Sequence, residues 1–168
     1  MEKKDLDWGN IGFSYMPTDK RYVANYKNGA WDEGAMISDP NVVINECAGI
    51  LQYCQEIFEG LKAYTTEDGS IVTFRPDLNA ERMMNSAKRL EMPPFPKERF
   101  LEAVDQVVKA NAAWVPPFGS GATLYLRPYM FASGPVIGVK PSQEYQFRLF
   151  GTPVGPYFKG GAKPLTLC

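Results

Sequence analysis

Apolar residues at helical spacing predict two helices in the middle of the chain. The first begins at Pro76, which suits the first turn of a helix because its missing N–H would be unpaired there anyway. Pro93 and Pro94 end this segment, and a second helix is predicted from about Lys97 to Ala113. The two apolar stripes consist of Ala80, Met83, Met84, Ala87 and Leu90, and of Phe100, Leu101, Val104, Val107 and Val108.

Alternating patterns and turn dipeptides predict strands on both sides of these helices. Asn28-Gly29 and Asp68-Gly69 each separate two short segments, and such dipeptides are the strongest short signals of a β-hairpin. Further strands are predicted at 122–132 and at roughly 144–151. Pro128 indicates that the first of these lies at a sheet edge.

Two segments before the helices have weaker patterns. The β-branched run Val42-Val43-Ile44 predicts a short strand. The stretch from Ile50 to Phe58 fits more than one pattern, and we expect a short helix there.

The order of the elements predicts an α+β fold. Short hairpin turns imply antiparallel pairing, so the helices are expected to pack on an antiparallel sheet. Residues 1–154 are interpreted as one small domain that begins with an extended arm of about 19 residues. A Gly-Gly-rich stretch and an apolar run that stops at Cys168 predict a linker and the truncated start of a larger domain at 155–168.

Composition excludes several kinds of site. The 168 residues include no histidine, so no Ser-His-Asp site, Cys-His site or His-ligated zinc site can be assembled within the chain, and no metal site is expected. Cys47, Cys54 and Cys168 form no C-x-x-C pair and favour a reducing compartment. The net charge of -1 gives no reason to expect a nucleic acid or a membrane as partner. Since no targeting or membrane-spanning segment is evident, we expect a cytoplasmic protein.

A few polar and aromatic residues are candidates for binding. Tyr125 and Arg127 share one face of a predicted strand, where a phenol and a guanidinium fork suit a carboxylate, although a solvated sheet face is the alternative. Arg82 flanks the apolar stripe of the first helix and fits either a surface charge or a phosphate ligand. Tyr53 and Phe58 fit either a core or a pocket.

Four blocks in order along the chain resemble the branched-chain amino acid aminotransferases, which are pyridoxal-phosphate enzymes of fold type IV. The blocks are FEGLKAY, TFRPDLNAERMMNSAKRL, WVPPFGSGATLYLRP and PVGPYFKGG, at 58–64, 73–90, 114–128 and 153–161. The resemblance runs from Leu6 to the last residue and covers only the family's smaller, N-terminal domain. It implies the N-terminal domain fold of D-amino acid aminotransferase-like enzymes.

The resemblance also implies roles for single residues. Arg82 matches the arginine that binds the cofactor phosphate. Tyr125 and Arg127 match a Tyr-x-Arg strand that holds substrate carboxylates, and the arginine chiefly serves the side-chain carboxylate of glutamate. Three further residues match the lining of the substrate pocket, namely Tyr53, Phe58 and Phe13. Val139 matches a residue that is lent to the pocket of the partner subunit in a homodimer. Around Tyr53 the chain departs from the family, with Cys54 where Gly or Ser is common.

The implied reaction transfers the amino group of leucine, isoleucine or valine to 2-oxoglutarate, which becomes glutamate. Pyridoxal 5'-phosphate would store the amino group and withdraw electrons. The family's Schiff-base lysine lies in the second domain, and neither Lys159 nor Lys163 matches its motif. No catalytic residue is therefore assigned, and this chain alone is expected to be inactive.

Two other interpretations stay open. One is a free-standing, non-catalytic domain that serves association or regulation. The other keeps the fold and changes the chemistry, to a D-amino acid aminotransferase or an aminodeoxychorismate lyase. The Tyr125-x-Arg127 pair favours the branched-chain group over these two enzymes.

Overall fold

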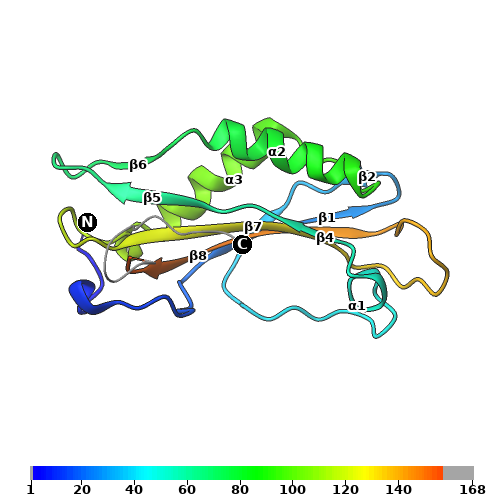
Figure 1. The fold of residues 1–168 in the computed structure, drawn as a ribbon, viewed down its shortest axis with the longest axis horizontal. Coiled ribbons are helices and arrows are strands. Elements are labelled where there is room, and N and C mark those ends of the chain that lie inside the picture. The colour runs from blue at the N-terminus through cyan, green and yellow to red at the C-terminus, as the bar shows by residue number, and fades with distance from the viewer. Residues whose placement is uncertain (1, 157–168) are drawn as a thin grey trace, which may run out of the picture.

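The computed structural model describes residues 2–156, and within them one antiparallel sheet of eight strands dominates (Figure 1). The strand order is β2-β1-β8-β7-β5-β6, with β3 beside β1 and β4 beside β7. The strands are β1 (Arg21–Lys27), β2 (Ala30–Trp31), β3 (Ala35–Ile37), β4 (Glu56–Phe58), β5 (Leu61–Thr65), β6 (Ile71–Thr73), β7 (Thr123–Ala132) and β8 (Tyr145–Val154). The predicted linker at 155–168, with Lys159, Lys163 and Cys168, lies almost wholly outside the described residues.

Both predicted hairpins are confirmed. Asn28 and Gly29 connect β1 to β2 with φ angles of 54° and 83°, the left-handed values that a tight hairpin turn requires. Gly69 has a φ of 81° in the turn between β5 and β6. An Asp-Gly or Asn-Gly pair forms such turns easily because Gly has no Cβ to strain the backbone.

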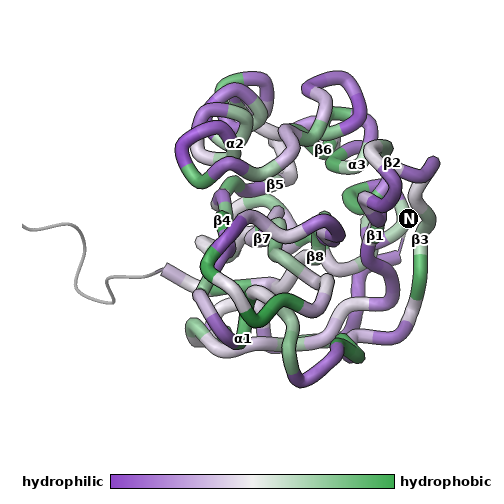
Figure 2. The backbone as a smooth tube through the Cα atoms, turned by 90° about the vertical axis from the view of Figure 1, so that its right-hand side faces the viewer, coloured by the Kyte–Doolittle hydropathy of each residue, from purple (hydrophilic) through white to green (hydrophobic). Residues whose placement is uncertain are grey.

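Two long helices cover one face of the sheet, as Figures 1 and 2 show. The first, α2 (Pro76–Arg89), begins at the predicted proline. The second, α3 (Lys97–Ala110), ends before the predicted Ala113, because Asn111 donates from its side-chain Nδ2 to the carbonyl oxygens of Val107 and Lys20, both at 2.8 Å. A 3₁₀ turn (Ala112–Trp114) follows. With this helical layer on the sheet, the predicted α+β class is confirmed.

One local prediction was wrong and another was only partly right. The run Val42-Val43-Ile44 forms no strand, and Val43 is 95% exposed, because no sheet edge lies beside it to complete a ladder. The predicted helix from Ile50 to Phe58 is only partly present. It covers α1 (Gly49–Tyr53), ends where Cys54 turns left-handed at a φ of 53°, and gives way to β4.

Pro128 does not mark an edge strand, so that prediction was wrong as well. β7 has β8 on one side and β4 and β5 on the other. Pro128 lies opposite the short gap between β4 and β5, where it accepts a hydrogen bond from Glu59 N at 2.8 Å. A proline is tolerated inside the sheet here because the ladder is already interrupted on that side.

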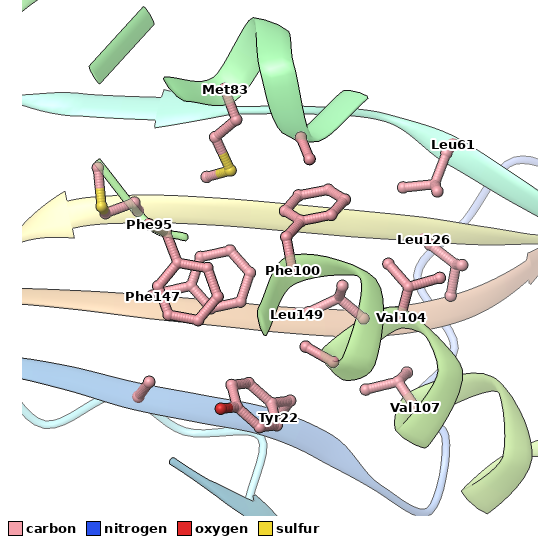
Figure 3. Packing of buried hydrophobic residues seen from close by; sticks show 14 of the residues in the cluster. Tyr22, Leu61, Met83, Phe95, Phe100, Val104, Val107, Leu126, Phe147 and Leu149 are labelled. Carbon is pink, nitrogen blue, oxygen red and sulfur yellow. The ribbon is translucent and has the colours of Figure 1, made fainter. Parts of the chain in front are cut away.

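The core lies between the two long helices and the sheet (Figure 3). Phe95 stacks on Phe147 with 3.9 Å between ring centroids, and Phe100 contacts the same ring of Phe147 at 6.1 Å. Leu124 and Leu126 of β7 are fully buried beneath the helices. Because side chains alternate along a strand, every second residue of β7 and β8 faces away from this core.

The N-terminal arm begins beside the turn after α3, where Lys4 N donates to Ala113 O at 2.9 Å, and its later part runs along β8. Met16 N donates to Thr152 Oγ1 at 2.9 Å, and Thr18 Oγ1 donates to Gly151 O at 3.0 Å. The predicted arm is therefore attached to β8 by specific hydrogen bonds. Among the residues that the structure describes, no helix has the length and apolar character needed to cross a membrane.

Candidate functional site

On the face away from the helices, β7 presents Tyr125 and Arg127 side by side. Arg127 Nε donates a hydrogen bond to Tyr125 Oη at 3.0 Å. Leu124 and Leu126 point into the core instead, so the predicted alternation of the strand is confirmed. The two polar groups are half-buried, which keeps them accessible to a ligand from the open side of the sheet.

Aromatic rings surround this pair. The guanidinium carbon of Arg127 lies 4.4 Å from the ring centroid of Phe58 and 5.2 Å from that of Tyr125, which is cation–π geometry. Phe13, from the N-terminal arm, contacts Tyr125 with 6.2 Å between ring centroids. Phe13 and Phe58 are 53% and 60% exposed, respectively. The structure thus brings four of the sequence-predicted residues together from the arm, β4 and β7.

Gly60 makes the position of Tyr125 possible. A Cβ atom at residue 60 would lie 2.6 Å from Tyr125 Oη, closer than any normal contact. The phenol can lie over the gap between β4 and β5 only because this residue has no side chain.

Arg82 is held by a carboxylate from the sheet. Its Nε and Nη2 donate to the two carboxylate oxygens of Glu59, at 3.2 and 2.8 Å. This hydrogen bonding, with the charge of Glu59, raises the pKa of Arg82 above its ordinary value. The Glu59 side chain is only 10% exposed, and Asn79 Nδ2 donates to its Oε2 at 2.8 Å. The guanidinium is therefore fixed in orientation, and its Nη1 has no acceptor among the described residues.

One cavity of about 300 Å³ joins Arg82 to Tyr125. Its other lining residues belong to β5, to α2 and to the segments just before them: Gly60, Leu61, Lys62, Tyr64, Phe74 and Asn79. This volume is at the lower end for small-molecule sites. Two cationic side chains, Arg82 and Lys62, line its wall, so the donor set suits a phosphate group.

Tyr53 and Val139 take no part in the contacts described above among Phe13, Phe58, Tyr125 and Arg127. The Tyr53 hydroxyl donates to the carbonyl oxygen of Ile137, and Val139, two residues further on, is 90% exposed. Neither residue has a hydrogen bond or ring contact with Tyr125 or Arg127 in the part of the chain that the structure describes. The structure thus connects Tyr53 with the loop that carries Val139.

Sequence reasoning assigned no role to Glu59, Gly60 or Asn79, although Glu59-Gly60 adjoins the candidate Phe58. All three lie within the blocks FEGLKAY and TFRPDLNAERMMNSAKRL, so a signal was present in the resemblance. The contacts themselves join residues about 20 positions apart, and no local pattern reveals them.

Comparison with known proteins begins with the fold. A crystal structure of the branched-chain aminotransferase from Thermoproteus uzoniensis matches 84% of this chain and 43% of its own, with a TM-score of 0.67 and 24% identity. A crystal structure of the Escherichia coli branched-chain amino acid aminotransferase matches 83% of this chain with 41% of the Escherichia coli chain, at a TM-score of 0.64 and 23% identity. The chain therefore has the α+β fold of a domain of class IV aminotransferases.

Sequence comparison gives the closer relationship. The branched-chain-amino-acid aminotransferase of Haemophilus influenzae is 55% identical over 161 residues, which cover 96% of this chain and 47% of the relative. The branched-chain-amino-acid aminotransferase of Helicobacter pylori is 49% identical over 158 residues, which cover 94% of this chain and 46% of the relative. No family model matches. The chain is thus a homologue of the branched-chain aminotransferases and spans about half the length of these relatives.

Proposed function

We propose that this chain is part of a pyridoxal-phosphate-dependent branched-chain amino acid aminotransferase. The observation that carries the proposal is the cavity that joins Arg82 to Tyr125, which in turn contacts Arg127. The 55% identity to the Haemophilus influenzae aminotransferase supports it. The proposed reaction moves the amino group of leucine, isoleucine or valine to 2-oxoglutarate, which becomes glutamate.

Arg82 is proposed to hold the phosphate of the cofactor. Glu59 occupies the Nε and Nη2 groups of Arg82, so Nη1 can donate to a phosphate oxygen. Lys62 adds a second positive charge to the same cavity wall. The cofactor, when bound, supplies the electron sink and stores the amino group.

Arg127 and the rings around it are proposed to hold the two kinds of substrate. A leucine-like side chain needs apolar walls, which Phe13 and Phe58 can provide. The side-chain carboxylate of glutamate or 2-oxoglutarate needs a cation, which Arg127 provides next to the Tyr125 hydroxyl. One site can then accept both substrates in turn.

The remaining parts of the enzyme are also proposals. We propose that residues 1–154 form its small domain and that 155–168 lead into a larger domain that supplies the Schiff-base lysine. Val139, which is exposed beside the loop contacted by Tyr53, would enter the pocket of a second copy, so the enzyme would act as a homodimer.

A chimera tests this function. The 168-residue chain is joined to the remaining part of the Haemophilus influenzae relative, and leucine is supplied with 2-oxoglutarate. The chimera should form glutamate and 4-methyl-2-oxopentanoate, whereas the unjoined chain should show no turnover. A chimera that folds and binds pyridoxal phosphate but ignores leucine, isoleucine and valine would refute the assigned substrates. Turnover by the unjoined chain would refute the proposal that the lysine lies elsewhere.

A further inference from the structure

A second cavity on the open face of the sheet contains two buried arginines. This cavity has a volume of about 270 Å³ and opens between β1, β7, β8 and the arm. Tyr129 of β7 lies directly opposite Arg148 of β8, and Arg21 comes from the start of β1. The wall residues used below are Tyr15, Arg21, Asn41, Tyr129, Arg148 and Phe150. Neither Arg82 nor Arg127 lines this cavity.

The positive charges of the two arginines are not neutralised by a carboxylate in contact with them. Arg21 is 3% exposed and Arg148 is 6% exposed. Neither takes part in an ion pair within residues 2–156. Burying an ionised guanidinium is costly unless an anion or several hydrogen bonds compensate. Two such groups at one small cavity make it strongly positive.

Neutral oxygen atoms accept the hydrogen bonds of both arginines. Arg21 donates to the carbonyl oxygens of Ser38 and Thr18, the latter at 3.0 Å. Arg148 donates to Gln146 Oε1 at 2.9 Å and to Asn41 O at 3.3 Å. The Nε of each guanidinium has no acceptor among the described residues. Donors are therefore left for a ligand.

Asp39 is an acidic group close enough to interact with both arginines. Its pKa lies below the ordinary value chiefly because Asn41 N–H donates to its carboxylate, and Arg148 and Arg21 contribute through their charge. It is exposed and forms no ion pair with either arginine. Asp39 thus does not neutralise either guanidinium by direct contact.

The rest of the wall is aromatic. Phe150 contacts Tyr15 and Tyr129 edge-on, with 5.8 and 6.0 Å between ring centroids. Burial raises the pKa of Tyr129, so its hydroxyl stays protonated and can donate a hydrogen bond. Rings beside two cations suit an organic anion with a short carbon chain better than a bare inorganic ion.

We propose that this cavity binds a small organic dicarboxylate at a site separate from Arg127. One guanidinium would pair with each carboxylate, and the rings of Tyr15 and Phe150 would contact the carbon chain. The site lies next to the candidate substrate site along the sheet, because Phe150 is opposite Arg127 in the ladder. The inference goes beyond the proposed function and does not depend on it.

Calorimetry on the 168-residue chain measures the binding of glutarate, which is the probe. Glutaramide is the uncharged control, and sulfate is the inorganic control. Glutarate should bind saturably and more tightly than either control. Arg148→Gln should weaken its affinity by at least about tenfold, as expected for a lost charge-assisted hydrogen bond, whereas Arg89→Gln, exposed on α2, should leave it nearly unchanged. Loss of binding in Arg127→Gln but not in Arg148→Gln would overturn the proposal.

A measurement on the unsubstituted chain covers the case in which Arg148→Gln does not fold. Glutarate should shift the Nε–Hε NMR signals of Arg21 and Arg148 and leave that of Arg82 in place. If neither signal moves, or if sulfate binds as tightly as glutarate, the site is not a dicarboxylate site.

Discussion

At Arg127, one guanidinium contacts a phenol oxygen on its own strand and an aromatic ring on the neighbouring strand. Such a group can meet a carboxylate or withdraw against a ring when the ligand is apolar. The sequence predicts the shared face of Tyr125 and Arg127, because alternation is a local property. It does not predict Glu59 or Gly60 as partners, because those contacts depend on how β4, β5 and α2 meet.

Replacing Arg127 with Ala in the chimera should separate the two substrates. We expect kcat/KM for glutamate to fall by about 100-fold, which corresponds to one lost charge-assisted pair, and that for leucine to fall much less. Steady-state kinetics with each amino donor measures this. Equal losses for the two donors would contradict the role of Arg127.

Gly60→Ala should disturb Tyr125 without unfolding the protein. The new methyl group would lie 2.6 Å from Tyr125 Oη, so the phenol must move and lose its hydrogen bond from Arg127. Turnover by the chimera should fall by about tenfold, with a change in unfolding free energy of about 1–3 kcal/mol. Gly9→Ala is the matched control, because its Cβ would meet only Asp7 at 3.8 Å. Unchanged turnover in Gly60→Ala would argue against this packing.

At the scale of elements, the hairpins and long helices follow from local sequence. Asn28-Gly29 and Asp68-Gly69 define their turns, and apolar stripes define α2 and α3. Prediction from local sequence fails where tertiary contacts determine the conformation of a segment. Val42-Val43-Ile44 lacks a neighbouring strand, and Pro128 is tolerated centrally because the ladder is interrupted there.

The packing of α3 and β8 should dominate stability. Phe147 is fully buried and stacks on Phe95, so Phe147→Ala leaves a cavity under the helices. We expect a loss of about 3–5 kcal/mol in unfolding free energy by urea denaturation. Phe118→Ala, at a position 62% exposed, should cost less than about 1 kcal/mol. Similar losses for both variants would contradict the assignment of the core.

The start of α2 carries a titratable pair. Arg75 donates from Nε and Nη2 to the Asp77 carboxylate, which lowers the pKa of Asp77 to about 2. Since the folded pKa lies below the unfolded value of about 3.9, any stabilisation is present above pH 4 and is lost as the pH falls toward 2. An NMR titration should find this low pKa, and Arg75→Gln should raise it. An ordinary Asp77 pKa in the unsubstituted chain would disprove the pairing.

At the scale of the whole molecule, the core and the Tyr125–Arg127 pair lie on opposite faces of one sheet. Figure 1 shows α2 and α3 on one side of the sheet. The core lies beneath these helices, and Phe13 of the arm contacts Tyr125 on the other face. Arg82 reaches the same cavity as Tyr125 from α2. Local alternation indicates the Tyr125–Arg127 pair in advance, but only the family resemblance relates this pair to Arg82, which is far away in the sequence.

The affinity of the chimera for pyridoxal phosphate shows whether Arg82 holds the cofactor phosphate. Arg82→Gln should weaken this affinity by at least about tenfold, whereas Arg89→Gln, on the same helix and exposed, should not change it. The loss should be confined to the Arg82 variant. An Arg82→Gln chimera that binds the cofactor as tightly as the unsubstituted one would contradict it.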